Sequence, residues 1–278
     1  MSPAYGLICA VLLNGTAEGA DSTRLAGIVV DERDRPLAGV KVYLSFDGMP
    51  PEVHSKAESD DSGQFSVTLP PETNGSFAPP GFALWAYKPG WGVTMEELRR
   101  HAMPAGEPIR VVLGPAAQSH FRVLGPNGRP VAGLRIVADA LRRGHLHPLP
   151  QELADQAAVV TDRAGTAVVT ALDHADMGRI RFISAEFGNQ EIWGYTRPAN
   201  EAITLRPVGR IVGRIVSEAP VSGASISLTS QAQQEQGQPN PIRGVAEVVV
   251  DARGRFDLPA MVAGNLFGSV VLPPSAAM

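Results

Sequence analysis

The chain has 278 residues, which leaves room for two to three domains that are each large enough to bury a hydrophobic core. Hydrophobic residues make up 44% and charged residues 19% of the chain, which are globular values and exclude a disordered tail. With 28 acidic and 24 basic residues there is no basic field to attract a nucleic acid, and we expect no nucleic-acid partner.

The first twenty residues differ from the rest of the chain. The run Tyr5–Leu13 is apolar but too short to span a bilayer, and small residues follow it at positions 15–17, as a signal peptidase requires. We therefore predict a secretory signal peptide over residues 1–20, with a frayed start or a first strand as the alternative, since no lysine or arginine precedes the run. Cys9, the only cysteine, lies inside it, so the mature chain would form no disulfide.

Two short motifs occur three times each, roughly 90 residues apart, which is the period of a small domain. One is a Pro-x-x-Gly step that leads into a segment of alternating apolar residues. The other is an Asp-x-x-Gly turn, in which the aspartate can accept hydrogen bonds from the turn and the glycine can adopt a positive φ. The predicted turn residues are Pro36, Gly39, Asp60, Gly63, Pro130, Gly133, Asp162, Gly165, Pro220, Gly223, Asp251 and Gly254.

Apolar residues occupy every second position after each Pro-x-x-Gly step, as at Val40, Val42 and Leu44. This period predicts strands with one face on a core and the other on water. The fold class is therefore predicted to be all-β, a tandem array of three antiparallel β-sandwiches at 22–115, 116–207 and 208–278. In the first, 81–87 reads as an inner strand, 109–113 as the closing strand, and 94–101 as a short helix because Thr94 and Glu97 form a capping box.

The third unit is predicted to be short, because only 24 residues follow Gly254 and the last strand-like run is Phe267–Leu272. One strand is expected to be missing. A shortened module or a truncated gene would explain this. The alternative is an open sheet edge that a partner chain completes by strand addition.

The two motifs together resemble the carboxypeptidase regulatory-like domain, a transthyretin-like β-sandwich related to the Cna-B modules of bacterial surface proteins. The resemblance rests on the stretches 34–39 and 127–133 and on the three Asp-x-x-Gly turns. It implies three transthyretin-like sandwiches used for binding and spacing. The resemblance to Cna-B modules also suggests an intramolecular Lys–Asn isopeptide bond. We expect this bond to be absent, because residues 116–278 contain no lysine and Lys41 lies on the outward phase of its strand.

His145 and His147 are the candidate metal ligands, because two imidazoles at i and i+2 on an extended segment point the same way. Glu152, Asp155 and His174 are near in sequence, but the spacing fixes no third ligand. We therefore predict a solvated loop here, with no metal and no cofactor. The turn aspartates are predicted to cap turns instead of binding calcium.

Trp91, Trp193 and Tyr195 are the candidate ligand-binding residues, because aromatic rings can form a platform on which sugars stack. The alternative is that they simply cover strand ends. No catalytic motif is recognisable, and no catalytic residue is predicted.

These observations predict a non-catalytic binding or spacer protein that is exported to the periplasm, the cell surface or the medium. Its partner would be a protein or a cell-envelope polysaccharide. The alternatives are a carbohydrate-binding module and an accessory subunit of a larger hydrolase assembly.

Overall fold

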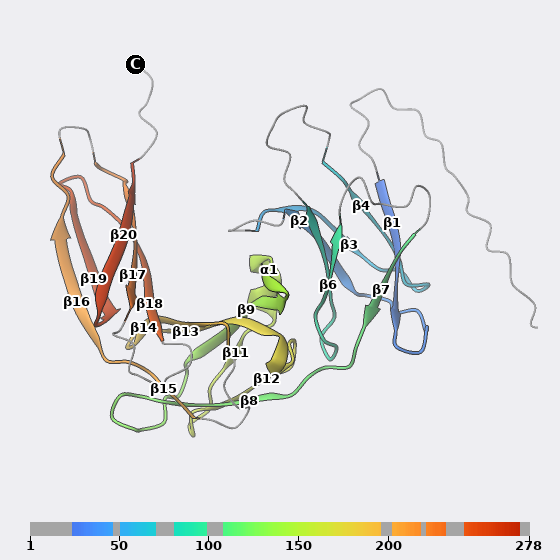
Figure 1. The fold of residues 1–278 in the computed structure, drawn as a ribbon, viewed down its shortest axis with the longest axis horizontal. Helices are drawn as coiled ribbons and strands as arrows, with labels where there is room; N and C mark the ends of the chain where they lie inside the picture. The colour runs from blue at the N-terminus through green and yellow to red at the C-terminus, as the bar shows by residue number, and fades with distance from the viewer. Residues whose placement is uncertain are drawn as a thin grey trace, which may run out of the picture.

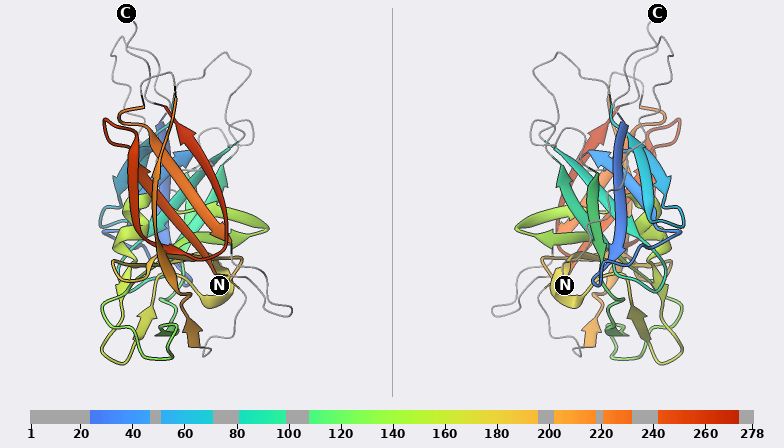
Figure 2. Two further views of the ribbon diagram at one scale, coloured as in Figure 1. Left: turned by 90° about the vertical axis from the view of Figure 1, so that its left-hand side faces the viewer. Right: turned by 90° about the vertical axis from the view of Figure 1, so that its right-hand side faces the viewer.

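The computed structural model describes residues 24–46, 51–70, 81–98, 108–195, 202–217, 221–231 and 242–272. Strands dominate these ranges, and the predicted all-β class is confirmed (Figure 1). The first, second and third units denote residues 22–115, 116–207 and 208–278, a division that stays our own prediction. The first and third units stand on either side of the second (Figures 1 and 2).

Strands of the first unit form two sheets, with the orders β4-β1-β7 and β3-β2-β5-β6. All neighbours pair antiparallel except β1 and β7, which run parallel. The strands are β1 (Arg24–Asp31), β2 (Lys41–Phe46), β3 (Val53–Glu58), β4 (Gln64–Thr68), β5 (Phe82–Tyr87), β6 (Thr94–Leu98) and β7 (Ile109–Leu113).

Strands of the second unit repeat this order, as β12-β8-β15 and β10-β9-β13-β14, and β15 runs parallel to β8 as β7 does to β1. The insertion between the hairpin strands adds β10, a short helix α1 and β11, which also pairs with β9. The elements are β8 (Ser119–Leu124), β9 (Arg135–Arg143), β10 (His145–Pro148), α1 (Gln151–Gln156), β11 (Val159–Val160), β12 (Thr166–Val169), the 3-10 helix η2 (His174–Asp176), β13 (Met177–Ser184), β14 (Gly188–Trp193) and β15 (Ala202–Thr204).

The third unit contains the pair β16-β19 and the sheet β18-β17-β20, and no described residue occupies the positions that β6 and β7 hold in the first unit. Strand β18 pairs with β14, so one sheet of eight strands runs through the second and third units. The strands are β16 (Val208–Arg214), β17 (Ser225–Gln231), β18 (Arg243–Val249), β19 (Arg255–Val262) and β20 (Asn265–Val271).

The three Asp-x-x-Gly turns share one set of hydrogen bonds. In the second, Asp162 Oδ1 accepts from the backbone N–H of Ala164 at 2.8 Å and of Thr166 at 2.9 Å. Gly165 has a φ of 73°, and its carbonyl accepts from the N–H of Val123 at 2.8 Å. A Cβ on this glycine would lie 2.5 Å from the Val123 carbonyl oxygen, so the turn admits no side chain there. Equivalent contacts surround the pairs Asp60 and Gly63, and Asp251 and Gly254.

The Pro-x-x-Gly steps lie against the same turns. The N–H of Gly39 donates to Ser59 O at 2.9 Å and that of Gly133 to Thr161 O at 2.9 Å, and both glycines have a positive φ. Gly223 has a φ of 79° and makes the corresponding bond. Pro36 and Pro130 form isolated bridges to the strands β1 and β8, whereas Pro220 lies outside the described residues.

A buried hydroxyl completes the first two copies, at the residue that precedes the turn aspartate. Thr161 is 4% exposed, and its Oγ1 accepts from Leu134 N at 3.0 Å and donates to Val131 O at 2.7 Å. Ser59 does the same in the first unit. In the third unit, Val250 stands at this position and has no hydroxyl. The N–H of Ala224 donates to the carbonyl oxygen of Val221 instead, at 3.0 Å.

Thr161→Val is expected to lower the free energy of unfolding by about 1–3 kcal/mol, because the buried N–H of Leu134 loses its acceptor while the side-chain shape is kept. Urea denaturation followed by circular dichroism measures the change. Thr229→Val, on the partly exposed face of β17, serves as the control and should have an effect within about 0.5 kcal/mol. Equal effects of the two substitutions would contradict the role assigned to the hydroxyl.

The first and second units share one hydrophobic core. Strand β5 is buried on both faces: Leu84 packs within the first sandwich, whereas Trp85 and Tyr87 belong to the core cluster of the second unit. The prediction that the strand after Gly39 has one face on water is wrong, because Tyr43 and Ser45 are 2% and 0% exposed. The second unit covers the face that the sequence pattern assigned to solvent.

The predicted helix at 94–101 is also wrong. Residues 94–98 form β6, in which Thr94 pairs with Ala86 and Leu98 with Phe82 of β5. Pairing with a buried strand outweighs the local capping signal, since Thr94, Met95 and Leu98 are all buried in the sheet. Residues 99–101 lie outside the described part of the chain.

Candidate functional site

The two candidate histidines lie on β10, at the junction of the first and second units. Gly144, with a φ of 69°, turns the chain so that His145 pairs with Arg143 across the β9–β10 hairpin. The alternation of the strand directs His145 and His147 to the same side, and their ring centroids are 3.9 Å apart. The side chain of His147 is 1% exposed and that of His145 is 61% exposed.

A third ligand-type side chain, Glu97, reaches the pair from β6 of the first unit. Its Oε1 lies 3.3 Å from His147 Nε2 and 3.7 Å from His145 Nε2. One ligand atom from each of the three residues lies within 4.8 Å of the others. Among the described residues, this is the one group of three such side chains close enough to hold a metal ion.

Sequence reasoning missed Glu97 for two reasons. It assigned 94–101 to a helix, and it searched for a third ligand only near the histidines in the chain. Two of the neighbours that it considered are engaged elsewhere: Glu152 pairs with Lys56, and Asp155 with Arg135. The third, His174, begins η2, and its side chain is outside the description.

A second polar group lies nearby, where a carboxylate is buried between two arginines. Asp139 on β9 is 3% exposed and accepts two hydrogen bonds from Arg179 on β13, at 2.7 and 3.0 Å. Arg181 Nε lies 2.5 Å from Asp139 Oδ2. These three residues line a cavity of about 420 Å³ that is completed by Pro51, Pro148, Leu149 and Gln151. The single carboxylate balances only one of the two guanidinium groups, so these three side chains together carry one positive charge.

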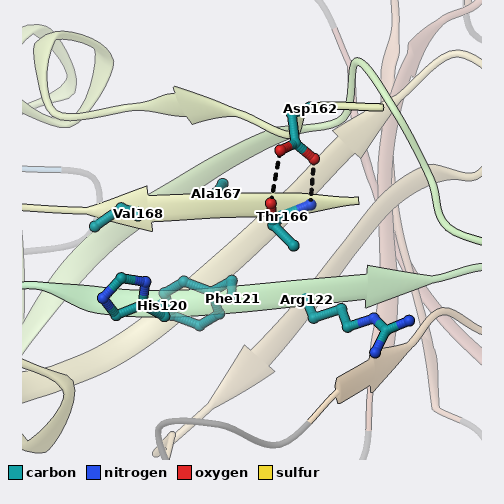
Figure 3. Close-up of a pocket in the computed structure, with 7 residues that line it drawn as sticks. All are labelled: His120, Phe121, Arg122, Asp162, Thr166, Ala167 and Val168. Atoms are coloured by element: carbon teal, nitrogen blue, oxygen red, sulfur yellow. Dashed lines mark hydrogen bonds between the residues drawn. The ribbon is translucent and has the colours of Figure 1, made fainter. Parts of the chain in front are cut away.

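A hollow of about 410 Å³ lies over β8 and β12 of the second unit and is lined by His120, Phe121, Arg122, Asp162, Thr166, Ala167 and Val168. Figure 3 shows the Asp162 carboxylate at one end, held by the backbone and the hydroxyl of Thr166. These hydrogen bonds keep the pKa of Asp162 below its usual range. Both carboxylate oxygens of Asp162 therefore accept hydrogen bonds within the turn. The residues that line this hollow do not form a pair of a nucleophile and a base.

The three candidate aromatic residues do not form one surface. Tyr195 is 1% exposed and packs against Phe121 in a tilted arrangement with 5.8 Å between the ring centroids, so its ring is closed to a sugar. Trp91 packs against the core of the first unit. Trp193 donates to Glu191 and lies under the guanidinium of Arg179, 5.2 Å from the ring centroid. Burial raises the pKa of the Glu191 carboxyl above its usual range, and the Trp193 hydrogen bond opposes this.

The three lysines make polar contacts on the first unit or toward α1. Lys41 Nζ donates to Gln156 Oε1 at 3.0 Å, and Lys56 pairs with Glu152, so both connect the first unit to α1. Lys88 Nζ donates to Ala38 O at 2.7 Å.

The fold defines a protein of several packed, all-β sandwich units. No family model matches the chain, and no curated protein matches its sequence. The resemblance to the carboxypeptidase regulatory-like domain therefore stays a prediction.

Solved structures of bacterial pilins are similar in their β-rich architecture. The shaft pilin SpaA from Lactobacillus rhamnosus GG is 10% identical, with 66% of this chain and 97% of that chain covered and a TM-score of 0.28. A streptococcal ancillary pilin is 11% identical, with 91% of each chain covered and a TM-score of 0.21. BcpA, the major pilin subunit of Bacillus cereus, is 11% identical, with 89% and 88% covered and a TM-score of 0.23. Scores this low carry no argument about function.

Proposed function

We propose that this chain is a non-catalytic, exported binding protein that presents an open sheet edge on a stiff body of packed sandwiches. The partner is an extended segment of another protein, which adds a strand to β20 of the third unit. The observation that carries this proposal is the exposure of β20.

All seven residues of β20 are exposed, and the strand pairs only with β17 among the described residues. Leu266 and Val270 lie opposite Ser230 and Ile226, on the face that points toward the sandwich interior, yet they are 48% and 50% exposed. Their counterparts on β5 of the first unit, Phe82 and Ala86, are at most 6% exposed. An added strand would cover apolar surface that the third unit leaves in water.

A second edge is open on the other sheet of the same unit. Strand β16 pairs with β19 alone among the residues described here, whereas β1 of the first unit pairs with β4 and also with β7. Val212 on β16 is 67% exposed. Unpaired edges with exposed apolar side chains are the sites at which extended segments add to sheets.

Two features support a stiff body. The apolar core shared by the first and second units, which includes the fully buried Trp85, resists bending between them. The sheet that passes from β14 to β18 joins the second unit to the third through backbone hydrogen bonds. A stiff body would hold the open edge at a fixed position and orientation.

Export is supported by the apolar run Tyr5–Leu13 and the small residues after it. The described part of the chain includes no helix with the length and apolar character needed to cross a bilayer.

Hydrogen exchange of the purified chain tests the proposal, together with capture of partners from the native envelope fraction. The amides on the open edge of β20 are expected to exchange fast in the free chain and slowly in the complex. Leu266→Lys, on the inward face of β20, should abolish capture, and Val160→Lys, at an exposed residue on β11 of the second unit, should not.

A monomer in ultracentrifugation whose β20 amides all exchange slowly would contradict strand addition. Turnover of a substrate by the pure chain would contradict the non-catalytic proposal. Binding on a glycan array that Trp91→Ala or Trp193→Ala abolishes would favour a carbohydrate-binding module instead.

A further inference from the structure

At the junction of the first and second units, the two distances from Glu97 to the histidine nitrogens match those between donors of a zinc site, and all three donor atoms lie within 4.8 Å of one another. A tetrahedral zinc ion with bonds of about 2.0–2.2 Å to nitrogen and oxygen places its donors about 3.4 Å apart. Glu97 Oε1 lies 3.3 Å from one imidazole Nε2 and 3.7 Å from the other. An ion could therefore bind with only small rotations of the side chains.

The strands that carry the donors are held in place by contacts that do not involve an ion. Arg143 Nη1, at the end of β9, donates to the carbonyl of Met95 on β6 at 2.9 Å, and this contact ties the hairpin to the first unit. Glu97 is fixed in register by its pairing with Ala83 on β5. Leu146, between the histidines, packs against Gly178 of β13, so both imidazoles face Glu97. This arrangement is preorganised, which lowers the entropic cost of binding.

The donor set selects a class of metal ion. Two imidazoles and one carboxylate suit zinc and similar divalent transition metals, whereas calcium and magnesium prefer sites made of oxygen ligands alone. The side chains of Glu97 and His145 are 43% and 61% exposed, so solvent can reach a fourth coordination position.

The competing explanation is a set of hydrogen bonds between the histidines and acceptors. His147 Nε2 also lies 3.3 Å from the carbonyl oxygen of Arg143. A ring nitrogen that carries a proton and donates a hydrogen bond to this carbonyl cannot bind a metal ion. Metal binding requires that proton to leave, so zinc and the hydrogen bond exclude each other at this nitrogen. The two explanations therefore predict different responses to added metal.

We propose that Glu97, His145 and His147 bind one zinc-class divalent ion, which fastens the first unit to the second. Sequence reasoning favoured a solvated loop because it found no third ligand, and the geometry supplies one from the other unit. The ion would add a coordinate link to an interface that already combines an apolar core with polar contacts such as that of Lys56 and Glu152.

Calorimetric titration of the tag-free, chelator-treated full chain with Zn²⁺ tests this proposal. One ion per chain is expected to bind, and the melting temperature should rise with zinc because the ion binds only the folded state. Glu97→Gln and His145→Asn, both at exposed side chains, should each weaken zinc binding at least about tenfold. Loss of a residue that only hydrogen-bonds to a metal ligand already weakens binding about tenfold or more, and these two residues would be ligands themselves. Cobalt in place of zinc should give the visible spectrum of a tetrahedral nitrogen and oxygen site.

Two matched substitutions serve as controls. Glu96→Gln changes the adjacent carboxylate on β6, and His120→Asn changes an exposed histidine on β8, and neither should alter the affinity. Absence of stoichiometric binding, or unchanged affinity in both Glu97→Gln and His145→Asn, would overturn the proposal. Equally tight binding of calcium would overturn the assignment to a transition metal.

Discussion

Trp85→Ala is expected to lower the free energy of unfolding by about 3–5 kcal/mol, the range for removing a large buried aromatic side chain. Trp85 is fully buried between the first and second units, and its Nε1 donates to Ser45 Oγ at 3.2 Å. The substitution leaves a cavity at the shared core and removes the partner of a buried hydroxyl. Denaturant unfolding followed by circular dichroism measures the change.

The same variant tests whether the two units are coupled. If the shared core holds them together, amides of β9 and β13 in the second unit should lose protection from hydrogen exchange, although the change is in the first unit. Trp91→Ala is the control, because Trp91 packs against the core of the first unit alone. Unchanged protection of β9 and β13 in Trp85→Ala would show that the units fold independently.

Asp139→Asn is expected to lower the free energy of unfolding by about 3–5 kcal/mol, because it leaves the partly buried Arg179 and Arg181 without their buried counter-ion. The asparagine keeps the shape of the aspartate, so the loss reports charge and not packing. Thermal and urea unfolding give the change.

The exposed pair of Arg210 and Asp257 provides the matched control. It has the same two-pronged geometry, but the side chains are 65% and 45% exposed. Asp257→Asn should leave the denaturation midpoint almost unchanged, because water screens exposed pairs. A midpoint for Asp139→Asn as high as that of Asp257→Asn would mean that the buried carboxylate does not hold the two arginines.

The sequence predicts the all-β class well because its strongest signals are local. A glycine with positive φ and an aspartate that accepts its own turn's N–H groups act within four residues, and Asp162 and Gly165 carry that information by themselves. The alternating segments likewise mark strands before any partner is known.

What the sequence could not predict depends on contacts between units. The pattern at Tyr43 and Trp85 identifies strands but does not reveal that a second unit covers their outer faces. Glu97 approaches His147 from a strand about fifty positions earlier, and no spacing rule connects them. The capping pattern at Thr94 describes a helix that the neighbouring β5 prevents.

The pairing of β18 with β14 has a consequence for the order of synthesis. Because β14 precedes β18 in the chain, it leaves the ribosome first and can already be folded when β18 emerges. The third sandwich would then form by pairing with a strand that is already folded. If the second unit folded slowly, assembly of the third unit would be delayed as well.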